Sequence, residues 1–300
     1  MATLQTTQAR AQPMRSTLIA VAWGSMLLPG CVPWVWSLWT GTPMPFWINW
    51  VGCGGVLLLW LLALTWPGLR PLRNYLLALL ALLAADALRN QLLVSPAYIT
   101  WTKTAGWGMA LVVDRALRWI PTLLMLLTVF ATGRRRRDVF LAKGDLQAPV
   151  QPNALFKKPR PWIAEAREFI LYFSLGIIIF NWLLLHPDLS RFSLALVNLP
   201  FIVLGAALNS SSEEVTFRGV LMGQLVPALG AHQAVWLQAT FFGLVHWAGN
   251  PSGPLGVLLA GFLGWFLGKS VLETRGLAIA VTSHCLLNTI QYLMFALIQA

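Results

Sequence analysis

The chain has 300 residues, of which 57% are hydrophobic and only 10% are charged. Soluble globular domains carry about a quarter charged residues, so this composition excludes them. The basic residues behind the net charge of +11 cluster in short loops between apolar runs, a distribution that is typical of membrane proteins and argues against nucleic-acid binding. The three cysteines lie inside apolar runs without metal-ligand spacing, so neither a disulfide framework nor a zinc knuckle is expected.

Apolar runs long enough to cross a bilayer, about 20 residues each, recur along most of the chain. We therefore expect an all-α, polytopic membrane bundle of about eight to ten helices. The polar N-terminal segment carries two arginines, which favours a cytoplasmic N-terminus in a multi-pass protein of the plasma (inner) membrane. The apolar runs of the first half cover residues 17–40, 45–67, 74–92 and 107–132.

Basic residues separate the two halves of the chain. The run 107–132 ends at four consecutive arginines, Arg134 to Arg137, which predict a cytoplasmic anchor. The following segment is rich in lysine and proline and contains no apolar run, so we expect a cytoplasmic linker. We therefore divide the chain into N-terminal membrane helices of unassigned role, the linker and a second membrane domain. These parts cover residues 1–137, 138–162 and 163–300.

The second half contains further apolar runs and one polar interruption. The runs cover residues 167–186, 192–208, 231–248, 253–271 and 276–298. The interruption, SSSEEVTFRG at 210–219, places Glu213 and Glu214 side by side. Arg218 follows Glu214 by four residues, so these two side chains share one helix face and can pair. Ionisable groups at membrane depth are costly, and we treat them as a functional hypothesis.

The same stretch also fits a helix start. Ser210 lies three residues before Glu213, and Ser211 lies three residues before Glu214. Either pair has the spacing of a capping box, in which a serine and an acidic side chain satisfy free backbone amides at the N-terminus of a helix. Under that interpretation the two glutamates only cap the helix and pair with a neighbouring arginine.

The polar interruption also affects the expected topology. We expect the run 192–208 to end on the cytoplasmic side and 211–229 to form a new helix that crosses or re-enters the membrane. The run 231–248 then returns to the cytoplasmic side and brings its histidine back to Glu213. This topology has a cost, because it places two basic residues on the outer side, against the charge rule. These residues are Lys269 and Arg275.

Two of the four histidines lie inside apolar runs and have distinctive neighbours. His246 follows Phe242 by one helical turn, and His284 precedes Asn288 by one turn. The other two, His186 and His232, lie at the ends of expected helices and suit the membrane interface. A single histidine on an apolar helix is more often a packed core residue than a catalyst. Two histidines, an asparagine and a glutamate pair on three separate helices favour a site.

The order and spacing of these residues resemble the CPBP (Abi/CAAX-protease-related, Rce1-like) family of intramembrane endopeptidases. That family carries Glu-Glu-x-x-x-Arg, then Phe-x-x-x-His, then His-x-x-x-Asn. The resemblance covers roughly residues 165–300, and we recognise no motif before residue 160. The matching residues are Glu213, Glu214, Arg218, Phe242, His246, His284 and Asn288.

The resemblance implies a role for each of these residues. Glu213 is expected to act as general base on water, assisted by His246. His284 and Asn288, one turn apart, are expected to donate hydrogen bonds to the developing oxyanion. Glu214 pairs with Arg218 and holds the helix in place, with Phe242 as a further supporting residue. The expected partners are the lipid bilayer and a membrane-associated or lipid-modified protein or leader peptide as substrate.

Metal use and three other functions stay open at this point. A glutamate and two histidines are a known zinc ligand set. The chain lacks the His-Glu-x-x-His helix, which places two zinc ligands one turn apart. We therefore expect no cofactor and a water molecule that is activated by glutamate without a metal. A zinc-dependent version of the same protease is the alternative. A non-enzymatic membrane immunity protein of the same fold is a second alternative. A proton-coupled transporter with a Glu–His relay is the third.

Overall fold

A computed structural model describes residues 2–299, with side chains described for residues 15–298. The described residues form an all-α bundle without strands, as the apolar runs predicted. The helices of the first half are α1 (Ala2–Thr40), α2 (Trp47–Thr65), α3 (Arg73–Leu93), α4 (Pro96–Ala105), α5 (Trp107–Leu117) and α6 (Trp119–Ala131). Those of the second half are α7 (Trp162–Leu185), α8 (Phe192–Val197), α9 (Leu199–Glu214), α10 (Met222–Leu229), α11 (Ala231–Leu244), α12 (Gly253–Thr274) and α13 (Ala278–Gln299).

Six of the described helices are long and apolar enough to cross a membrane, and a bent helix pair in the second half raises the number to seven. The chain is therefore an integral, multi-pass membrane protein. The helices outnumber the predicted eight to ten, because expected spans are divided into shorter pieces. The run 107–132, for example, breaks at Arg118 into α5 and α6.

The polar interruption at 210–219 does not begin a new helix. Residues 199–229 form one continuous helical rod, in which a π-helical segment, Val215–Leu221, joins α9 to α10. The bend lies earlier, at 71° between Leu189–Val197 and the rod. The capping boxes do not form, because the hydroxyls of Ser210 and Ser211 donate to the carbonyls of Ala206 and Ala207, one turn back. Serine can therefore stay inside a helix without breaking it.

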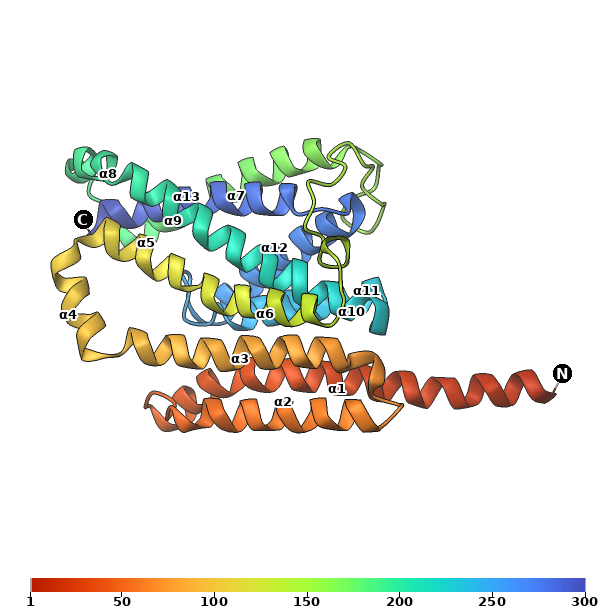
Figure 1. Cartoon of the computed structure of the whole chain (residues 1–300). Coiled ribbons are helices and arrows are strands. Elements are labelled where there is room, and N and C mark those ends of the chain that lie inside the picture. Colours follow the sequence, from red (N-terminus) through yellow and green to blue (C-terminus); the bar gives the residue numbers. More distant parts are fainter. Residues whose placement is uncertain (1, 300) are drawn as a thin grey trace.

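The continuous rod also corrects the expected topology. Lys269 Nζ donates to the carbonyl of Gln151, and the amide of Asp145 donates to the carbonyl of Thr274. The end of α12 therefore packs on the 138–162 segment, at the same end of the bundle as the four arginines (Figure 1). Lys269 and its neighbour Arg275 thus follow the charge rule rather than violating it. The prediction that placed them on the outer side was wrong because it counted residues 192–208 and 211–229 as two separate crossings of the membrane.

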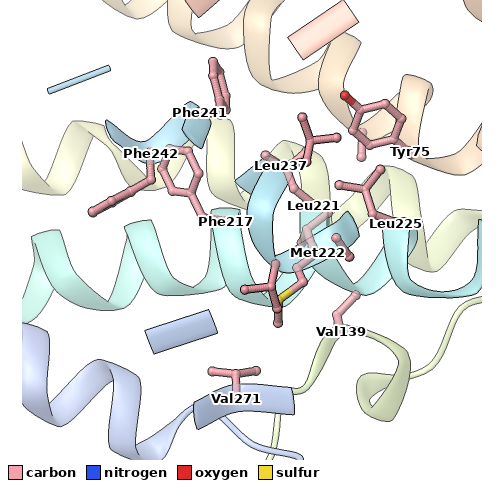
Figure 2. Close-up of a cluster of buried hydrophobic side chains, with 14 of the residues drawn as sticks. Tyr75, Val139, Phe217, Leu221, Met222, Leu225, Leu237, Phe241, Phe242 and Val271 are labelled. Atoms are coloured by element: carbon pink, nitrogen blue, oxygen red, sulfur yellow. The ribbon is translucent and has the colours of Figure 1, made fainter. Parts of the chain in front are cut away.

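The π-helical segment lies at the centre of the protein core. All of its residues are buried, and Phe217 packs edge-on against Phe242 of α11 at a centroid distance of 5.1 Å. Figure 2 shows this cluster of buried side chains, in which Tyr75 of α3 and Val271 of α12 lie on opposite sides. Helices from both halves of the chain therefore pack on the segment that follows the two glutamates.

Candidate active site

The adjacent glutamates lie deep inside the bundle. Glu213 is 14 residues after Leu199, which places it about 21 Å along the rod at 1.5 Å per residue. The expectation that Glu213 begins a helix at the cytoplasmic face is therefore wrong. Both glutamates are buried, and the π-helical segment begins at the next residue. Such segments often occur at functional sites, because they redirect side chains along a helix.

Glu214 forms a fully buried ion pair on its own helix. Its Oε1 accepts a hydrogen bond from Arg218 Nη1 at 2.9 Å, and neither side chain is exposed to solvent. The guanidinium of Arg218 also lies over the ring of Phe242, with 4.0 Å between Cζ and the ring centroid. The predicted pairing of Glu214 with Arg218 is present, and Phe242 covers it through a cation–π contact.

His284 connects the two glutamates. Its Nδ1 lies 2.8 Å from Glu214 Oε1, and its Nε2 lies 3.8 Å from Glu213 Oε2. A carboxylate can only accept hydrogen bonds, so Nδ1 carries the proton in this contact. The Glu214 contact therefore fixes the orientation of the ring and directs Nε2 toward Glu213. The sequence predicted that Glu214 pairs with Arg218 but did not predict that the same carboxylate also binds His284.

His246 lies in the turn after α11, which ends at Leu244 rather than at the expected residue 248. Its Nδ1 is 2.6 Å from the carbonyl oxygen of Phe242, and the two rings lie 4.4 Å apart. Because the carbonyl can only accept, Nδ1 must carry the proton and Nε2 is left as an acceptor. Phe242 also contacts the ring of His284 edge-on at 5.9 Å, so one phenyl ring packs against both imidazoles.

Five polar atoms of the predicted site are buried without a hydrogen-bond partner among the described residues. They are Glu213 Oε2, Glu214 Oε2, Arg218 Nε, Arg218 Nη2 and Asn288 Nδ2. Buried polar groups are nearly always paired, so an orphaned atom calls for an explanation. Of these residues, only Glu213 and Asn288 line the same large cavity. Glu213 offers an acceptor and Asn288 a donor, the two capacities that a hydrolytic site needs for water and for an oxyanion.

These groups line a large cavity of about 1360 Å³. Glu213, His246, His284 and Asn288 all contribute to its wall. Apolar residues of α1 and α2 also line it, among them Val32 and Val51. The structure thus brings together the four predicted catalytic positions in one cavity, walled by helices from both halves of the chain.

Several site residues were not found from the sequence. Arg118, at the break between α5 and α6, donates from Nη1 to Glu213 Oε1 at 3.1 Å. A cluster of amide side chains also borders the cavity through Gln291, which exchanges hydrogen bonds with the buried Asn181 of α7 at 3.2 and 3.1 Å. Asn250 donates to Asn181 Oδ1 at 3.0 Å. The only sequence signal for these residues was their polarity within or beside apolar runs.

The geometry does not form an evident metal site. Among the side chains that the structure describes, no three histidine, cysteine, aspartate or glutamate residues converge closely enough to hold an ion. Nδ1 of both imidazoles is engaged, by a carbonyl at His246 and by a carboxylate at His284. Histidines that bind zinc through Nε2 commonly donate Nδ1–H to a carbonyl or carboxylate, so these two contacts do not distinguish a zinc site from a metal-free one. The expectation that no metal is used stays a prediction, which chelation of the purified protein tests.

Comparison with known proteins supports the resemblance. Residues 194–290 match the model of a family described as type II CAAX prenyl endopeptidase Rce1-like. The matched segment runs from α8 into α13 and includes all seven motif residues, whereas Arg118 lies outside it. No curated protein and no solved structure matches the chain. The match confirms the family resemblance for this segment and supports a peptide hydrolase.

Proposed function

Because residues 194–290 match an endopeptidase family, we propose that this chain is an intramembrane endopeptidase in which Glu213 activates the attacking water. The observation that carries the proposal is the orphaned Oε2 of Glu213, a residue that lines the cavity and whose Oε1 is engaged by Arg118. A general base needs a free lone pair within hydrogen-bond reach of the water whose proton it takes.

The proposed reaction is peptide-bond hydrolysis by direct attack of water. The water oxygen bonds to the carbonyl carbon while its proton moves to Glu213 Oε2. His246 assists, because its Nε2 is free to accept a hydrogen bond from the same water. When the tetrahedral intermediate collapses, the carbon–nitrogen bond breaks and the departing amine takes the proton that Glu213 received. Atoms and charges balance without a further reactant.

The developing oxyanion needs donors that are already in position. Asn288 Nδ2 is such a donor, since it is buried and has no partner among the described residues. His284 can add a second hydrogen bond from Nε2 only when the ring carries both protons, because Nδ1 donates to Glu214. Asn288 is therefore the primary oxyanion donor in our proposal, and His284 contributes as an imidazolium.

The proposed substrate is a membrane-associated or lipid-modified protein or leader peptide. The cavity is larger than the few hundred to about 1,000 Å³ of ordinary small-molecule sites, and apolar residues of α1 and α2 form one wall. A peptide that is anchored in the bilayer can therefore place its polar backbone against the catalytic groups and its apolar part against these helices.

The test is cleavage of a panel of membrane-tethered peptides by the purified full-length protein in liposomes. We expect Glu213→Gln and Glu213→Ala to lower cleavage by about 10²- to 10⁴-fold, the contribution of a positioned general base. The control is Glu168→Gln, because Glu168 pairs with Arg160 at the surface of α7. Equal rates for Glu213→Gln and wild type would refute the proposal.

Chelators added to the same reactions decide the metal question. We expect cleavage to persist after treatment with EDTA and 1,10-phenanthroline. Loss of cleavage that zinc restores would instead place Glu213 and the histidines around a metal ion. Glu214→Gln adds a second comparison, because this change removes the anion that holds His284 and Arg218 while leaving Glu213 in place.

A further inference from the structure

We propose that Arg118 is a positioning residue for Glu213, so that helices outside the family-matched segment complete the active site. The inference rests on the proposed role of Glu213 as the general base. Arg118 precedes α6, and its partner lies 95 residues later on α9. The match to the endopeptidase family begins at residue 194 and therefore does not include it.

The contact distinguishes the two oxygens of the Glu213 carboxylate. Arg118 Nη1 lies 3.1 Å from Oε1, whereas Oε2 has no hydrogen-bond partner among the described side chains. The two oxygens of a free carboxylate are equivalent, so what the ion pair fixes is the direction of the carboxylate plane. With one oxygen held by Arg118, the other lies on the side of His284 Nε2, 3.8 Å away.

Arg118 itself is held in register with the catalytic helix. Trp119 Nε1, on the next residue, donates to the carbonyl of Leu208 at 3.2 Å. One turn later, the hydroxyl of Thr122 lies 2.9 Å from that of Thr216 and is buried with it. These contacts fasten α6 to the rod on both sides of Glu213 in the sequence. The arginine is thus supplied by a docked helix rather than by a mobile loop.

The surrounding charges leave Arg118 as the cation for Glu213. The neighbouring arginines are already paired. Arg89 of α3 lies 2.9 Å from Asp86, and Arg115 of α5 lies 3.0 Å from Asp114. Asp114 lies 4.0 Å from Arg118 Nε, beyond hydrogen-bond distance, so it orients the guanidinium without replacing Glu213 as its partner. Each arginine of this cluster therefore has a defined acid, and Glu213 is the acid of Arg118.

The two adjacent glutamates thus have separate cations from separate halves of the chain. Glu214 pairs with Arg218 on the same helix, and Glu213 pairs with Arg118 from the N-terminal half. A buried carboxylate without a partner is expensive, so two carboxylates at this depth need two cations. The N-terminal helices supply the second one, which gives them a role in catalysis.

Kinetics of three Arg118 variants test the assignment. We expect Arg118→Gln to lower kcat by about 10- to 100-fold with KM unchanged. This loss is no larger than the rate enhancement of a general base, because Arg118 acts only through Glu213. Arg118→Lys retains a cation and should recover most of the activity. Arg118→Ala should be rescued by millimolar guanidinium, which the large cavity can admit. Arg160→Gln, at the protein surface, is the matched control for loss of an arginine.

A change in KM alone would mean that Arg118 binds substrate, and unchanged kinetics would mean that it does not position Glu213. Either result overturns the inference while leaving the proposed hydrolysis intact. A second measurement does not depend on activity. We expect Arg118→Gln to lower the melting temperature in the wild-type background and to have a smaller effect in a Glu213→Gln background.

Equal effects of Arg118→Gln on melting in both backgrounds would refute the ion pair. This comparison of melting temperatures in the two backgrounds remains decisive if the wild-type protein cuts none of the peptides. In that case the proposed hydrolysis lacks support, while the melting data still establish whether Arg118 and Glu213 interact. The failure of one proposal is thereby distinguished from the failure of the other.

Discussion

Arg218→Met removes the cation from a fully buried ion pair, and we expect it to lower the free energy of unfolding by about 4 kcal/mol. Neither Arg218 nor Glu214 is exposed, and Nη1 and Oε1 are 2.9 Å apart. Methionine keeps a long apolar side chain, so the change leaves little empty space. The loss therefore reports mainly on the charge.

The expected magnitude follows from the geometry. Two unit charges 2.9 Å apart attract by about 6 kcal/mol at an effective dielectric constant of 20. Removing one member of a buried pair typically costs about 3 to 5 kcal/mol, since the other charge stays buried. The hydrogen bond from His284 to the same oxygen of Glu214 lowers the loss, and the lost contact with Phe242 raises it. Because these two effects oppose each other, we take the middle of that range, about 4 kcal/mol, as the expected loss.

The assay is unfolding by SDS in mixed micelles, followed by the fluorescence of the 16 tryptophans. Arg73→Met, at an exposed position at the start of α3, is the control and should change stability by less than about 0.5 kcal/mol. The double variant Glu214→Gln/Arg218→Met removes both charges and should recover at least half of the loss. A single variant within 1 kcal/mol of wild type, or a double variant no more stable than the single, would refute the reasoning.

Two further predictions concern the packing of α11 on α12 and the proposed oxyanion donor. Gly243→Ala would place a Cβ atom 2.5 Å from the carbonyl oxygen of Val257, so we expect α11 and α12 to separate and the melting temperature to fall, whereas Gly24→Ala, with nothing within 4 Å, should not change it. Asn288→Ala should lower kcat by about 10²- to 10³-fold at unchanged KM, the usual effect of removing one oxyanion donor. In steady-state peptide cleavage, a rise in KM without a fall in kcat would instead make Asn288 a substrate-binding residue.

Much of the site could be predicted from local spacing. The pairing of Glu214 with Arg218 follows from their separation of four residues on a helix. The same rule places His284 and Asn288 on one face of α13, and both line the cavity. These relations depend only on helix geometry, which any apolar run of this length adopts in a membrane. The roles of these residues in catalysis remain predictions until the variants are measured.

The continuity of the rod could not be predicted, because a run of three serines and two glutamates resembles a break between helices. In the structure, the serine hydroxyls donate to carbonyls one turn earlier, and the glutamates have cations. The polar side chains are thus satisfied within the helix, so the backbone does not need to leave it. Hydropathy alone does not detect such compensation.

Arg118 was missed for a different reason, because it lies 95 residues from Glu213 in sequence and belongs to no motif. A charge argument could have found it. Two buried carboxylates require two cations, and the local spacing supplied only Arg218. The apolar run 107–132 contains two arginines and an aspartate at membrane depth, which is as costly as the glutamate pair itself. When one apolar run carries an unpaired acidic residue, the other apolar runs should therefore be searched for a basic residue that can pair with it. Here that search leads from the glutamate pair to Arg118 in the N-terminal half of the chain.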